Sequence, residues 1–100
     1  MGSVVPFDDP ADYARVHRRI KRLWNEGTFE IHLHAQRAMA KRKIDLLDVQ
    51  NIVMYGSIIS HDRRDGQWRH RIQGGTVANV TASVIVTIIG RVLALSVLDY

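Results

Sequence analysis

The stretch ASVIVTIIGRVLALSVL, residues 82–98, decides the fold. It contains two apolar runs that are separated only by Gly90 and Arg91. The branched apolar residues of both runs favour strands, and a two-residue link suits a tight hairpin. Runs that are apolar on both faces are typical of strands covered on both sides. We therefore expect residues 82–89 and 92–98 to form the central strands of a sheet.

Two further strands are expected before this hairpin. Residues 57–61 form the first, and the turn 62–66 contains an Asp-Gly pair that favours positive φ at a hairpin. Residues 67–73 form the second, and the pair Gly74-Gly75 ends it. Alternation divides this strand into an apolar face and a basic face. The members are Trp68, His70 and Ile72 on the first, and Arg69, Arg71 and Gln73 on the second.

Three helices are expected ahead of the sheet. The first spans residues 10–26, since Asp9 can cap it and Pro10 fits its first turn. Its apolar stripe leaves several arginines on the wet side. An extended piece at residues 28–33 leads into a second helix that begins near His34.

The third helix begins after Asp45, where Asp48 resembles the acidic partner of a capping arrangement, and it ends at Tyr55-Gly56. Together these elements predict an α+β domain, with N-terminal helices packed on an antiparallel four-stranded sheet. We expect a tail at residues 1–9 and one domain at residues 10–100.

The composition limits the class of protein. The chain of 100 residues contains no cysteine, which excludes a disulfide framework, a thiolate metal site and a cysteine nucleophile. No apolar run approaches the roughly 20 residues that span a bilayer, and the start lacks the pattern of a secretion signal. We therefore expect a soluble cytoplasmic protein with no membrane partner.

Positive charge is concentrated in one third of the chain. Residues 11–43 hold nine Lys/Arg and three Asp/Glu, which gives +6, whereas the whole chain carries +4. A basic patch on an otherwise balanced domain fits a nucleic acid or the acidic surface of a protein, because both are attracted over long range.

The helix expected at residues 34–43 carries the main candidates for chemistry. His34, Ala38 and Arg42 share a face of roughly 12 Å from end to end. Histidine transfers protons near neutral pH, and arginine binds phosphate. The alternative is a packing helix in which Ala35 and Met39 face the core and the basic side is only solvated.

Metal-independent RNA cleavage needs a base for the 2′-hydroxyl, an acid for the leaving oxygen and cations that stabilise the phosphorane. The candidate catalytic residues are therefore His34, Arg42 and Arg71. His70 lies on the opposite face of its strand, where we expect a partly buried, hydrogen-bonded residue. Contacts to RNA are expected from five other basic residues of the helices and the strand. These are Arg18, Arg22, Arg37, Lys41 and Arg69.

Metal or cofactor chemistry has little support in the sequence. His32 and His34 could bind a metal with His61 or His70, but a helix that starts at His34 turns the two rings apart. There is no Gly-rich phosphate loop and no serine nucleophile motif. We expect no metal and no cofactor.

Several of these residues resemble a bacterial family of small domains of unknown function, whose usual opening is H-A-x-x-R-M-x-x-R-x-I. His34-Ala35, Met39, Arg42 and Ile44 fit this opening, whereas Ala38 replaces its first arginine and Arg37 lies one position earlier. Val49, the run Gly56-Ser57-Ile58-Ile59, a strand that ends at Gly74 and the final hairpin extend the resemblance over residues 29–98.

This family is similar to the RelE-like and BrnT-like ribonuclease toxins of toxin–antitoxin modules. The resemblance implies a RelE-like fold and a toxin that cleaves RNA or blocks translation. His34 would act as acid or base, and Arg42, Arg69 and Arg71 would hold phosphate. An acidic antitoxin segment would neutralise the toxin by covering the basic surface.

Two other functions remain open on the sequence alone. One is a nucleic-acid-binding protein without catalysis, whose affinity comes from the basic helices. The other is a small interaction or inhibitor module that binds an acidic partner surface.

Overall fold

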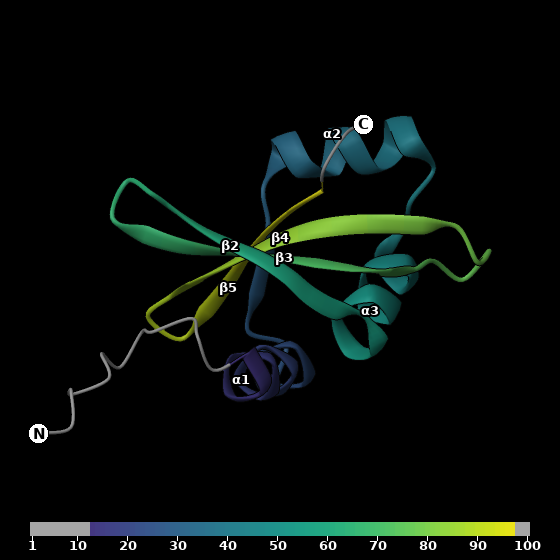
Figure 1. The fold of residues 1–100 in the computed structure, drawn as a ribbon. Coiled ribbons are helices and arrows are strands. Elements are labelled where there is room, and N and C mark those ends of the chain that lie inside the picture. Colours follow the sequence, from purple (N-terminus) through teal and green to yellow (C-terminus); the bar gives the residue numbers. More distant parts are fainter. Residues whose placement is uncertain (1–12, 98–100) are drawn as a thin grey trace, which may run out of the picture.

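Three helices and five strands make up the part of the chain that the computed structural model describes, residues 13–97 (Figure 1). They are, in chain order, α1 (Tyr13–Asn25), β1 (Phe29–Ile31), α2 (Leu33–Arg42), α3 (Leu46–Tyr55), β2 (Ser57–Arg64), β3 (Gln67–Gly75), β4 (Thr81–Ile89) and β5 (Val92–Val97). The expected α+β class and order of elements are confirmed. The expected tail at 1–9, the helix start at Pro10 and the strand end at Leu98 lie outside the described residues.

The sheet is mixed and has the order β1-β5-β4-β3-β2, so the prediction of four antiparallel strands is wrong. The fifth strand is β1, which runs parallel to β5 and pairs Phe29 with Leu93 and Ile31 with Leu95. The Leu93 N–H also donates to the carbonyl of Thr28, at 2.9 Å. Because β1 covers the outer edge of β5, both strands of the β4–β5 hairpin are interior, as predicted.

Two strands are longer than expected. β2 continues to Arg64, so the turn shrinks to Asp65 and Gly66, which have φ values of 52° and 77°. The ion pair between Asp62 and Arg69 joins the two strands near this turn. β3 continues through Gly74 and Gly75, because both pair with β4.

Helices cover both faces of the sheet: α1 and α3 lie on one face, and α2 lies on the other (Figure 1). The main core lies between the sheet and the pair α1 and α3. Its most buried side chains come from both layers and are Ile20, Ile52, Val53, Ile72, Val84, Val86 and Leu93. The alternation expected for β3 is confirmed, since His70 and Ile72 are buried in this core.

α3 is fixed at its start by the predicted capping box. The Asp45 carboxylate accepts from the Asp48 N–H, and the Asp48 carboxylate accepts from the Asp45 N–H, both at 3.0 Å. Asp48 also accepts from the N–H of Val77 at 2.8 Å, which ties α3 to the β3–β4 loop. The backbone hydrogen bonds from Asp45 and Val77 lower the pKa of the buried Asp48 carboxyl.

α3 and β3 approach most closely at two glycines. A Cβ on Gly56 would lie 2.5 Å from the carbonyl oxygen of Ile52 and 2.6 Å from that of Gln73. A Cβ on Gly74 would lie 2.9 Å from the Gly56 Cα. The end of α3 can therefore pass over the sheet only where both positions lack a side chain.

Within residues 13–97, no helix combines the length and the apolar character needed to cross a membrane.

Candidate nucleic-acid interface

α2 packs on the second face of the sheet through one narrow stripe. Ala35 and Met39 are buried, and Ala38 and Arg42 are half-buried beside them. Since successive residues turn by about 100°, the exposed side chains of His34, Arg37 and Lys41 share one flank of the helix. Gln36 lies on the other flank and donates to the carbonyl of Ile31 at 2.8 Å. α2 therefore packs on the sheet and also presents a basic flank to solvent.

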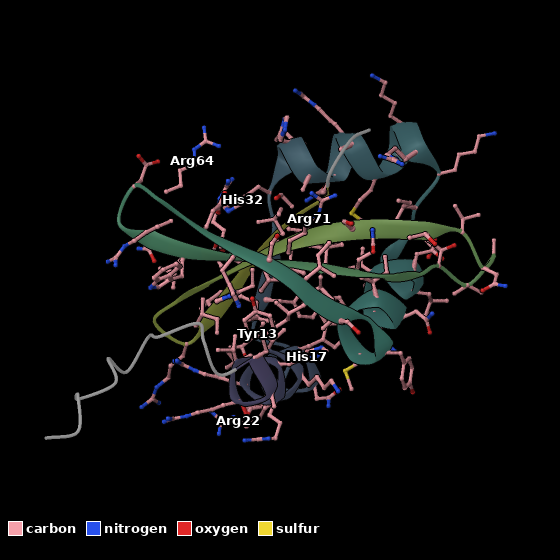
Figure 2. The ribbon with its side chains drawn as sticks, viewed as in Figure 1. Tyr13, His17, Arg22, His32, Arg64 and Arg71 are labelled. Atoms are coloured by element: carbon pink, nitrogen blue, oxygen red, sulfur yellow. The ribbon has the colours of Figure 1, made fainter. Side chains whose placement is uncertain are left out.

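The arginines of β3 lie on the same side of the sheet as α2. Arg71 pairs with Ile85, which pairs with Ser96, and Ile31 pairs with Leu95. Arg71 and the start of α2 therefore lie at the same height along the strands. Three strand-to-strand spacings, about 14 Å in all, separate the backbone of β3 from that of β1. Figure 2 shows Arg71, His32 and Arg64 on the side of the sheet where α2 lies. Half-buried and small residues, such as Ser96, lie between them.

Arg69 is engaged by a carboxylate. Its Nε donates to Asp62 Oδ1 at 2.7 Å, and its Nη2 donates to Asp62 Oδ2. The hydrogen bond from Arg69 lowers the pKa of the Asp62 carboxyl, and the same bond raises the pKa of Arg69. A phosphate would have to compete with Asp62 for this guanidinium.

The structure divides the predicted site residues between the two faces. His34, Arg37, Lys41, Arg42, Arg69 and Arg71 lie on the α2 side, on α2 and β3. Arg18 and Arg22 lie on α1, which covers the opposite face, so they do not belong to the same surface. We call the first set the α2-side surface. Within residues 13–97, the His34 side chain forms no hydrogen bond or ion pair, so no neighbour there orients its ring.

Residues 31–92 match a protein family described as a domain of unknown function, DUF4258. The chain belongs to the DUF4258 family. The match runs from the end of β1 to the start of β5, so it contains α2 and β3, and most of the expected range 29–98. No curated protein matches the chain at a significant level.

Two residues of this DUF4258 domain were not expected on the α2-side surface. His32, the exposed N-cap of α2, was considered only as a metal ligand, and Arg64 was placed in a turn. Because β2 extends to Arg64 and side chains alternate along a strand, Arg64 lies on the same face of the sheet as Asp62. Among the described residues, no three His, Asp or Glu side chains are grouped closely enough to hold a metal ion.

The remaining histidines of the DUF4258 domain lie on the other face. His70 is only 4% exposed, and its Nδ1 is 2.7 Å from Nδ1 of His61, so one ring donates to the other. Tyr13 of α1 packs edge-on against His61. Burial, and then the proximity of His61, lower the pKa of His70 to about 4. His70 is therefore neutral at pH 7. The expected hydrogen bond is present, and the residue is more deeply buried than the partly buried position expected for it.

Proposed function

We propose that this protein binds RNA on the α2-side surface and cleaves it without a metal ion, as a toxin-like ribonuclease that a protein partner neutralises. The supporting observation is that α2 and the arginines of β3 share one side of the sheet. This side offers the exposed His34 and the half-buried residues Arg42 and Arg71. Similarity of the DUF4258 domain to RelE-like toxins is part of the same proposal.

The proposed reaction is attack of the RNA 2′-oxygen on the adjacent phosphorus. His34 takes the proton of the 2′-hydroxyl as the O–P bond forms, and Arg42 and Arg71 stabilise the charge on the phosphorane. The 5′-oxygen then leaves and takes a proton from an acid, either the protonated His34 or water. The products are a 2′,3′-cyclic phosphate and a 5′-hydroxyl end.

The neutralising partner in this proposal is an acidic protein segment. Arg37 and Lys41 are exposed on the flank of α2 that also carries His34. A segment rich in Asp and Glu that covered this flank would block RNA and would be drawn to it by charge. Such binding weakens as salt is added, because exposed charges are screened.

RNA binding without cleavage is the second candidate, and two observations favour it. A general base usually has a neighbour that orients it, and His34 has none within residues 13–97. Arg69, one of the expected phosphate contacts, is paired with Asp62. Both observations fit a surface that attracts the RNA backbone and does not act on it.

The test is RNA cleavage by purified protein in the presence of a chelator, together with growth arrest on expression in a bacterial host. We expect His34→Ala to lower the cleavage rate at least about 100-fold without changing RNA affinity, since general-base catalysis contributes this much. Arg71→Ala and Arg42→Ala should lower both the rate and the affinity. The exposed Gln50 of α3 lies away from this surface, so Gln50→Ala is the control.

Each outcome separates the candidates. Cleavage by His34→Ala at the wild-type rate would exclude the proposed base. Salt-dependent RNA binding with no cleavage by the wild type would favour the second candidate. A wild type that neither binds nor cleaves RNA would exclude both.

A further inference from the structure

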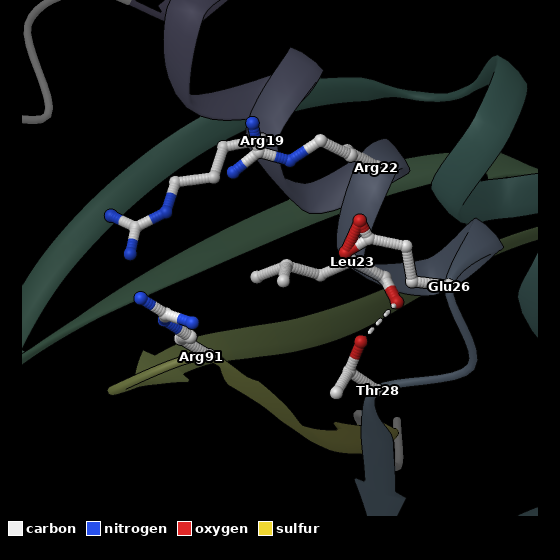
Figure 3. A pocket seen from close by; sticks show the side chains of 6 residues that line it. All are labelled: Arg19, Arg22, Leu23, Glu26, Thr28 and Arg91. Carbon is white, nitrogen blue, oxygen red and sulfur yellow. Dashed lines mark hydrogen bonds between the residues drawn. The ribbon is translucent and has the colours of Figure 1, made fainter.

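A separate cleft of about 510 Å³ lies between α1 and the β4–β5 turn, on the side of the sheet opposite to α2 (Figure 3). Its lining combines three arginines with one carboxylate, one hydroxyl and one apolar side chain. These are Arg19, Arg22, Leu23, Glu26, Thr28 and Arg91. The volume lies within the range of small-molecule sites and exceeds what a bare phosphate ion needs.

The three arginines reach the cleft from two elements that are far apart in the sequence. Arg19 and Arg22 are one turn apart on α1, and Arg91 follows Gly90 in the β4–β5 turn. The Nη2 of Arg19 donates to the Gly90 carbonyl at 3.2 Å, so this half-buried arginine links α1 to the turn. Figure 3 shows the guanidinium groups of Arg19, Arg22 and Arg91 gathered at one end of the cleft.

Two of these guanidinium groups have donors available for a ligand. Within residues 13–97, the side chains of Arg22 and Arg91 form no hydrogen bond and no ion pair. Both residues are exposed at the cleft, where like charges repel each other. An anion that accepted hydrogen bonds from both would remove this repulsion and use their fork-shaped donor geometry.

The charges of the cleft select the type of anion. Three arginines and Glu26 leave a net charge of about +2 at pH 7. A phosphomonoester carries roughly −1.5 to −2 at this pH, which matches the cleft, whereas one phosphodiester carries only a single charge. In Figure 3 the Glu26 carboxylate lies away from the guanidinium groups of Arg19 and Arg91, where it can accept hydrogen bonds from hydroxyl groups of the ligand.

We propose that this cleft binds a phosphomonoester, with Arg22 and Arg91 as the main ligands of the phosphate and Arg19 as the residue that joins the two walls. The group can belong to a free nucleotide or to a 5′-phosphorylated RNA end. This site goes beyond the proposed function, because it lies on the other face of the sheet and requires no cleavage by His34.

The experiment is calorimetric titration of the full chain with AMP and adenosine, and with RNA oligonucleotides of one sequence that carry a 5′-phosphate or a 5′-hydroxyl. We expect AMP to bind at least about tenfold more tightly than adenosine, or the 5′-phosphorylated RNA to bind at least about tenfold more tightly than its 5′-hydroxyl form. The first preference identifies a free nucleotide and the second identifies an RNA end.

Two double variants distinguish specific phosphate binding in the cleft from general electrostatic attraction to the basic protein. The double variant Arg22→Gln/Arg91→Gln should abolish the preference for phosphate. Arg15→Gln/Arg18→Gln removes the same net charge from exposed positions of α1 outside the cleft and should keep that preference. His34→Ala should also keep it, even if the proposed function fails. The proposal is overturned if neither phosphate form is preferred, or if both double variants lose the preference equally.

Discussion

Replacing Gly56 by alanine should destabilise the protein strongly, although alanine is compatible with the local backbone. The φ of Gly56 is −77°, so the substitution causes no conformational strain of its own. The new Cβ would lie 2.5 Å from the Ile52 oxygen and 2.6 Å from the Gln73 oxygen, and both are backbone atoms. Restoring ordinary contact requires α3 and β3 to separate by several tenths of an ångström or more.

That separation would disturb the packing of Ile52 against the sheet, where Ile52 and Ile72 are fully buried. Overpacking of this kind costs about 1–3 kcal/mol, and we expect the upper part of the range because neither backbone atom can rotate away. A loss of about 2–3 kcal/mol corresponds to a melting temperature lowered by about 10–20 °C for a domain of this size.

The assay is thermal and urea unfolding followed by circular dichroism. Gly75→Ala is the matched control, because the nearest atom to its Cβ is the side-chain oxygen of Asn79 at 3.7 Å, an ordinary contact. It should change the free energy of unfolding by less than about 0.5 kcal/mol, as open positions do. Equal effects of the two substitutions would refute the steric argument.

Three further predictions concern single ionisable side chains. The free energy of unfolding should fall by up to about 1.4 kcal/mol per pH unit as pH is lowered from about 6.5 towards 4. The reason is that His70 becomes protonated in the unfolded chain in this range but not in the folded chain, where its pKa is about 4. The same dependence, measured by urea titrations, should have a smaller slope in His70→Gln. Asp48→Ala should cost about 2 kcal/mol in the same assay, since it removes the acceptor of two backbone N–H groups, and a loss below about 0.5 kcal/mol would contradict the role of Asp48. Asp62→Asn should leave the free energy of unfolding nearly unchanged, because the ion pair with Arg69 is exposed. It should tighten RNA binding, measured by filter binding at low salt, because Arg69 is released to contact phosphate. Unchanged or weaker binding would count against Arg69 as a phosphate contact.

The elements with strong local signals could be predicted from the sequence. The start of α3 was predicted because Asp45 and Asp48 form a reciprocal pair that needs no distant residue. The alternation of β3 correctly separated Arg71 from His70, and so placed the arginine face away from the main core. These features depend on residues close together in the chain.

The features that the sequence did not predict depend on contacts between distant residues. The extended piece at residues 28–33 was expected, but its place in the sheet was not. β1 has only three residues and no measurable period, and its parallel pairing depends on the distant strand β5. The continuation of β3 through Gly74 follows from pairing with Ala82, although glycines usually weaken strands. The cluster of basic residues on α1 gave no sign that Arg91 would join Arg19 and Arg22, since the turn that carries Arg91 lies at the other end of the chain.

The parallel pairing of Phe29 with Leu93 also affects the order of events during synthesis on the ribosome. α1 and β1 emerge early, but the strand that holds β1 emerges among the last residues described, and contacts between such distant segments form slowly. Until β5 has emerged, the apolar face of α1, which carries Ile20 and Leu23, cannot pack against β5 in the nascent chain. The arginine cleft, which needs Arg91 beside α1, is therefore a property of the completed domain, and a nascent chain that stops before β5 would lack it.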